Sequence, residues 1–66
     1  MIIKIAKNAN FPQWFQIVFT DALGFFDVID EVKGKARAMR IAKKLAKKEK
    51  IQNVDVDGFI MSTEEL

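Results

Sequence analysis

Residues 34–50 read GKARAMRIAKKLAKKEK, and this stretch decides the fold. At about 100° per residue, Ala38, Ala42 and Ala46 share one arc of a helix with Ile41 and Leu45. Cations fill the opposite arc, namely Lys33, Arg37, Arg40, Lys43, Lys44, Lys47, Lys48 and Lys50. We therefore expect a helix over residues 34–50 that begins at Gly34 and lies close against a sheet through its small side chains.

The segments before this helix have strand character. Residues 1–7 contain a β-branched run, and residues 8–13 hold the Asn and Pro residues of a loop. Residues 14–20 alternate, with Phe15, Ile17 and Phe19 on one side, and residues 25–32 resume strand chemistry after a turn at residues 21–24. The pattern predicts an antiparallel hairpin of residues 14–20 and 25–32.

After the helix, residues 53–60 alternate valines with Asn and Asp, which predicts a last, half-exposed strand. Residues 62–66 read as a frayed tail. The expected architecture is β-β-β-α-β in a single domain over residues 1–66. In fold class this is α+β, a small mainly antiparallel sheet with one amphipathic helix packed on one face.

Composition restricts the function. The chain has 66 residues, half of them apolar, with no Cys, His or Tyr. Thiol nucleophiles, histidine bases and zinc ligands are absent, so we expect no enzyme, no cofactor and no small-molecule substrate. The carboxylates Asp27, Asp30 and Glu31 are read as a solubility device on an exposed strand rather than as an acid pair. No apolar run reaches membrane-spanning length, and we expect a cytoplasmic protein without a membrane partner.

The charge is strongly asymmetric. Nine of the eleven basic residues and one acid lie in residues 33–50, so that stretch carries +8 and the remainder −6. Such a run indicates contact with nucleic acid or an acidic protein surface, although lysines can also serve solubility alone. The candidate anion-binding residues are Lys33, Lys35, Arg37, Arg40, Lys43, Lys44, Lys47 and Lys48.

A second candidate surface is aromatic. One helix covers one face of a sheet, yet the strands are apolar on both, which leaves Trp14, Val18, Phe25 and Ile29 as candidate protein-interface residues. They would serve a homodimer or a protein partner. Alternatively, the N-terminal strand and the loop of residues 8–13 fold over this face.

Residues 53–64 resemble a calcium-binding EF-hand loop, with Asn53, Asp55, Asp57 and Glu64 at oxygen-ligand positions and Gly58 at the sixth position. Val54 and Val56 suit a strand better than such a loop. We therefore expect no metal site.

The order of strands followed by a Lys-rich helix resembles the arm-binding domains of phage integrases. Residues 26–30 would match the second sheet strand of that family and residues 35–38 the helix start. Those domains present a basic sheet to DNA, whereas the strands here are apolar and acidic, so the resemblance carries topology only. The chain is also similar to small accessory proteins of phages and mobile elements, many of which bind and modulate host macromolecules.

The function expected from the sequence is that of a small, non-enzymatic regulatory binding protein. Its Lys/Arg-rich helix face would engage an anionic macromolecule, for which nucleic acid is the first choice. The alternative is a protein-protein interaction module, either an inhibitor of a host protein or a homo-oligomer, that docks through the aromatic sheet face or a strand edge.

Overall fold

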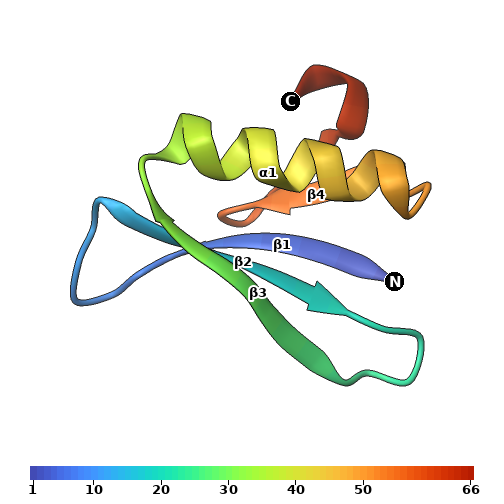
Figure 1. The fold of residues 1–66 in the computed structure, drawn as a ribbon, viewed down its shortest axis with the longest axis horizontal. Coiled ribbons are helices and arrows are strands. Elements are labelled where there is room, and N and C mark those ends of the chain that lie inside the picture. The colour runs from blue at the N-terminus through green and yellow to red at the C-terminus, as the bar shows by residue number, and fades with distance from the viewer.

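The structure, a computed structural model, describes residues 1–66 as one five-stranded sheet with one helix packed on it (Figure 1). The α+β fold class predicted from the sequence is confirmed. The strands are β1 (Ile2–Lys7), β2 (Trp14–Thr20), β3 (Phe26–Lys33), β4 (Asn53–Val56) and β5 (Phe59–Ser62). The helix α1 spans Lys35–Lys48, and a 3₁₀ turn, η1, spans Thr63–Glu65.

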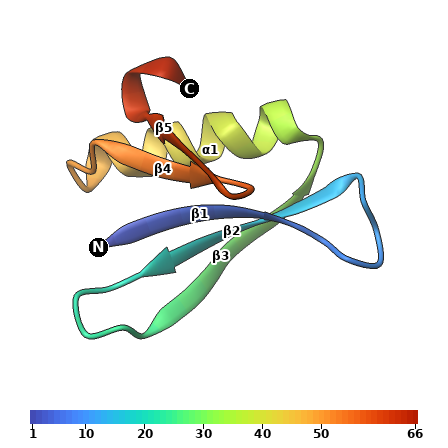
Figure 2. The same ribbon diagram turned by 180° about the vertical axis from the view of Figure 1, so that it is seen from behind.

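The sheet order is β3-β2-β1-β4-β5, which places the first strand of the chain at the centre. Ile5 of β1 is paired with Ile17 of β2 in an antiparallel register and with Val56 of β4 in a parallel one. Every other neighbouring pair is antiparallel. The helix connects the β3 edge of the sheet to β4 on the other side of β1 (Figures 1 and 2).

The core lies between α1 and one face of the sheet. Ala38, Ala42 and Ala46 have no exposed surface, and they pack over residues such as Ile3 and Ile5. Small side chains allow this close approach, as the sequence predicted. The larger Ile41 and Leu45 are only partly buried and flank the core, so the alanines rather than these two residues form the centre of the helix contact.

Gly34 begins the helix as its N-cap, with φ 98° and ψ 128°. Residues with a Cβ avoid this conformation, so the sharp change of direction between β3 and α1 requires glycine. The main-chain N–H of Gly34 donates to the oxygen of Gln13 at 2.8 Å, which fixes the junction to the start of β2. The helix ends at Lys48, two residues earlier than predicted.

The predicted hairpin is present as β2 and β3. Phe15 and Ile17 are buried and alternate with exposed or half-exposed neighbours, as predicted. The carboxylate of Asp21 accepts hydrogen bonds from the N–H groups of Leu23 and Phe25 and stabilises the connecting turn. A bulge in β3 interrupts the ladder opposite Ile17 and Val18.

The prediction of one strand over residues 53–60 is wrong, because two strands occupy this region. Asp57 and Gly58 both have positive φ, 50° and 94°, and form a tight turn between β4 and β5. The carboxylate of Asp55 accepts the N–H of Gly58 at 2.8 Å. Alternation of side chains does not mark a tight turn, whereas the Asp57-Gly58 pair is a hairpin signal that the sequence carries.

The prediction of a frayed tail over residues 62–66 is also wrong. Thr63 is 5% exposed, its main-chain N–H donates to the oxygen of Gln52 at 2.8 Å, and its hydroxyl donates to Ile51. These contacts hold η1 against the end of the helix. A polar residue takes part in the core here, which the apolar pattern of the sequence did not signal.

The N-terminal strand does not fold over the second face of the sheet. It lies within the sheet as β1, and the loop of residues 8–13 reaches only one end of the face opposite α1, where Asn8 donates to Glu31 and Phe11 lies near Trp14. Most of that face therefore has no covering element (Figure 2). That face is called the open face below.

Candidate functional site

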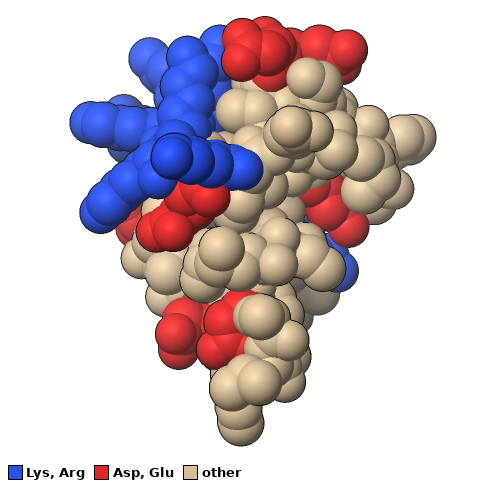
Figure 3. All heavy atoms as spheres, turned by 90° about the vertical axis from the view of Figure 1, so that its right-hand side faces the viewer, with Lys and Arg blue, Asp and Glu red and all other residues tan.

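Six cations point outward from α1 and form one continuous surface. We call this surface the basic arc; it consists of Arg37, Arg40, Lys43, Lys44, Lys47 and Lys48. All are exposed except Lys43, which is partly buried. The arc lies opposite the buried alanines because cations cannot be desolvated against the sheet. Figure 3 shows these basic side chains gathered on one side of the molecule.

Two of the eight predicted cations lie off this arc. Lys33 belongs to β3 and is paired with Trp14, which places it on the open face. Lys35 is seven residues before Ala42, on the inner side of the helix at its first turn, and is exposed. Helical periodicity grouped Lys33 with the cations of the helix. The grouping fails because β3 continues to Lys33 and the helix begins after it.

The cations of the basic arc are almost free of internal partners. Only Lys43 donates a hydrogen bond, 3.0 Å long, to the main-chain oxygen of Leu66. The other five make no hydrogen bond within the chain, and the first turn of α1 contains no acid. Their positive charge is therefore directed at the solvent.

Acidic residues border one flank of the arc. Asp27 and Asp30 of β3 are paired with Phe19 and Ile17 and so share the helix side of the sheet. Acidic side chains adjoin the basic ones in Figure 3. Positive charge is accordingly uncompensated on the solvent side of α1 and partly offset over β3.

An apolar groove of about 370 Å³ lies beneath this flank, lined by Ile29, Ile41, Lys44, Leu45 and Lys48. Ile29 therefore faces the helix side of the sheet. Trp14 and Val18 instead point to the open face, and Phe25 lies in the β2–β3 turn. The four predicted interface residues do not form one patch.

The open face carries large apolar side chains that the sequence analysis did not single out. Pairing across the sheet places Phe26 opposite Thr20, Val28 opposite Val18 and Ile60 opposite Asp55. Alternation adds Ile2 and Lys4 of β1 to this face. Period-two alternation was visible in the sequence, but the strand order that brings these residues together was not.

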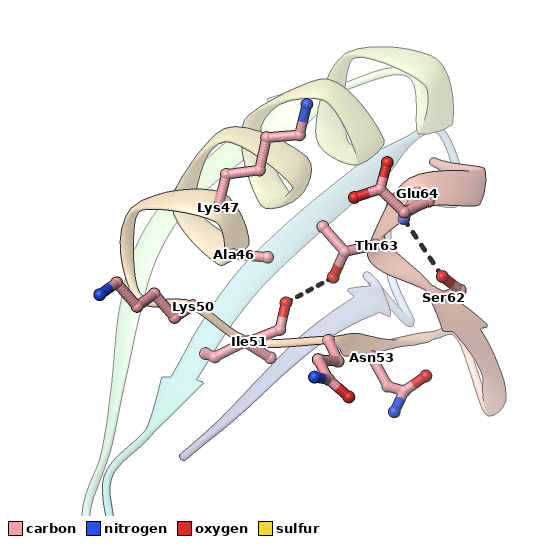
Figure 4. A pocket seen from close by; sticks show the side chains of 9 residues that line it. Ala46, Lys47, Lys50, Ile51, Asn53, Ser62, Thr63 and Glu64 are labelled. Atoms are coloured by element: carbon pink, nitrogen blue, oxygen red, sulfur yellow. Dashed lines mark hydrogen bonds between the residues drawn. The ribbon is translucent and has the colours of Figure 1, made fainter.

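A polar hollow of about 630 Å³ lies between the end of α1, the start of β4 and η1 (Figure 4). Its lining includes Lys47, Lys50 and Glu64. The hydroxyl of Thr63 is engaged with Ile51 at 2.7 Å, and that of Ser62 accepts the N–H of Glu64. Both hydroxyls thus take part in hydrogen bonds of the local fold.

The residues of the EF-hand-like stretch form a β-hairpin. Asn53 and Asp55 lie in β4, Asp57 lies in the turn, and Glu64 lies beyond β5. No cluster of three or more acidic, His or Cys side chains suited to a metal ion is present.

Comparison with known proteins gave no relative: no protein-family model, no curated protein and no solved structure matches the chain. The helix α1 is too short and too polar to span a membrane.

Proposed function

We propose that the protein binds duplex DNA through the basic arc, by contacts with phosphates and without strong base preference. The observation that carries this proposal is the set of six cations on one side of α1, five of which make no internal hydrogen bond. Lys and Arg side chains that neutralise phosphates release counterions, which supplies affinity independent of sequence.

The dimensions of the helix support a duplex as the partner. Arg37 and Lys48 are separated by roughly 16 Å along the helix axis at 1.5 Å per residue. The major groove of B-DNA is about 12 Å wide and admits a helix, whereas that of A-form RNA is too narrow and deep for side chains to read. Lys43 and Lys48 lie on opposite flanks of the basic arc. In such a groove each of them would face the phosphates of one DNA strand.

The charges of the sheet also favour DNA contact through α1, because they disfavour contact through the sheet. Asp27 and Asp30 repel phosphates from the β3 side, and the open face has as many acids as bases among Lys4, Glu31, Lys33 and Asp55. The solvent side of α1 is thus the surface with uncompensated positive charge.

The test is fluorescence anisotropy of a labelled 20-base-pair duplex, titrated with protein at several salt concentrations. Four or five phosphate contacts predict a slope of about −4 in the plot of log affinity against log salt. A single-stranded oligonucleotide is measured in parallel and should bind more weakly.

The variant is Arg40→Glu with Lys44→Glu, at the centre of the basic arc. Its matched control is Lys33→Glu with Lys35→Glu, which makes the same change in net charge at cations off the arc. We expect the first to lower affinity by at least about 100-fold and the second by about fivefold. Equal losses, or no binding of the wild type at low salt, would refute the proposal.

A further inference from the structure

The open face exposes apolar side chains across four of the five strands. Phe26 is 70% exposed, Val28 52%, Ile2 57% and Ile60 69%, and Trp14 lies on the same face. An apolar face of this extent has the character of an interaction surface. Antiparallel sheets that bury both faces commonly do so by packing on another sheet about 10 Å away.

We propose that a second copy of this chain docks on the open face, so that the two sheets pack against each other about a twofold axis. This inference goes beyond the proposed contact with DNA and does not depend on it.

Charge balance favours a second copy as the occupant. A twofold interface brings a surface against itself, so any net charge on that surface is doubled. The basic arc could not meet itself for this reason. The open face carries two bases and two acids and can do so without net repulsion; they are Lys4, Lys33, Glu31 and Asp55.

The position of one charged pair gives the geometry. Lys4 of β1 and Asp55 of β4 are register partners on adjacent strands near the middle of the sheet. The twofold axis lies in the plane of the interface and runs along the strands, between β1 and β4. It sets Lys4 of one copy opposite Asp55 of the other, and Asp55 of the first opposite Lys4 of the second. The same pair of residues therefore supplies two complementary contacts across the interface.

The size of the face is sufficient. One molecule has 4744 Å² of accessible surface. A stable interface of standard size buries about 800 Å² on each partner, which a contact over most of this face would provide.

The first measurement is sedimentation velocity of the wild type from 1 to 200 µM, a range chosen to span a dissociation constant of about 10 µM. We expect a monomer-dimer equilibrium. Trp14, the single Trp of the chain, lies on the open face, so its emission should shift to the blue as concentration rises. A strict monomer at 200 µM overturns the proposal.

The second measurement uses charge reversal. Lys4→Asp places two acids opposite each other across the interface, and Asp55→Lys places two bases there. Each variant alone should dimerise at least about 100-fold more weakly than the wild type. An equimolar mixture of the two should recover a heterodimer, because every crossed contact is then between opposite charges.

Recovery in the mixture separates an interface effect from a folding defect. Asp55 also accepts the N–H of Gly58, so Asp55→Lys could loosen the β4–β5 turn. Ile60→Lys, on edge strand β5, is therefore a second test, because in this arrangement Ile60 lies opposite β2 of the second copy, and it should weaken the dimer about tenfold. Lys44→Asp on the basic arc is the matched control. A dimer that survives Lys4→Asp and Ile60→Lys unchanged, or that is lost with Lys44→Asp, overturns the assignment to this face.

Discussion

The hydroxyl of Thr63 donates a hydrogen bond of 2.7 Å to the main-chain oxygen of Ile51, and this bond joins η1 to the segment that leaves α1. Thr63 is nearly buried, so water cannot replace the bond if it is removed. We predict that Thr63→Val, which keeps the shape of the side chain, lowers the free energy of unfolding by about 1–2 kcal/mol. Urea denaturation followed by circular dichroism measures this change.

The control is Thr20→Val, because the hydroxyl of Thr20 makes no hydrogen bond within the chain and its side chain is half-exposed. Its effect should stay within about 0.5 kcal/mol. Similar losses for the two variants would show that the Thr63 bond does not stabilise the fold.

Ala42 sets how closely the helix approaches the sheet. It has no exposed surface and lies in the core, so a larger side chain has no space. Ala42→Leu should destabilise the protein by about 2 kcal/mol or more through overpacking. Ala36→Leu, at an exposed position of the same helix, should leave the urea midpoint almost unchanged. A core that accepted both substitutions equally would contradict the close packing described here.

Gly34 provides a test of backbone strain without steric contact. Its φ is +98°, and a Cβ added there would meet no atom within 4 Å. Any loss of stability in Gly34→Ala therefore comes from the backbone conformation alone. We expect a cost of about 1–3 kcal/mol, which lowers the melting temperature by at least about 4 °C for a chain of this size. An unchanged melting temperature in a calorimetric scan would disprove this role.

Asp27 should weaken the proposed DNA contact, because it lies on the same side of the sheet as α1. Asp27→Asn removes the repulsion and is predicted to raise DNA affinity about twofold at low salt. Glu31→Gln changes the same charge on the same strand but on the open face, and should have a smaller effect. A larger gain from Glu31→Gln in the anisotropy titration would place the DNA on the sheet instead.

Much of this fold could be predicted from local patterns. The alanine spacing of residues 38, 42 and 46 defined the buried side of the helix, and Phe15 and Ile17 defined the buried side of β2. These signals depend only on side-chain period, which the sequence displays directly. The clean separation of cations from alanines also located six of the eight cations correctly on the outer surface of α1.

The remainder depends on contacts between distant residues. Nothing near Ile5 indicates that it pairs with Val56, so neither the central place of β1 nor the composition of the open face could be predicted. The burial of Thr63 likewise depends on an acceptor at Ile51 that only the tertiary fold supplies. The turn at Asp57 and Gly58 is different, because it is local and its Asp-Gly signal is present in the sequence.

The central position of β1 has a consequence for how the chain is made. During synthesis β1 emerges first and can form a hairpin with β2 at once, but its other edge stays bare until β4 has followed the whole helix out of the ribosome. Throughout that interval Ile3 and Ile5 border an unpaired edge, which nascent chains on neighbouring ribosomes could occupy. β4 therefore covers the second edge of β1 only late in synthesis. A chain stalled before residue 53 should depend on chaperones to remain unaggregated.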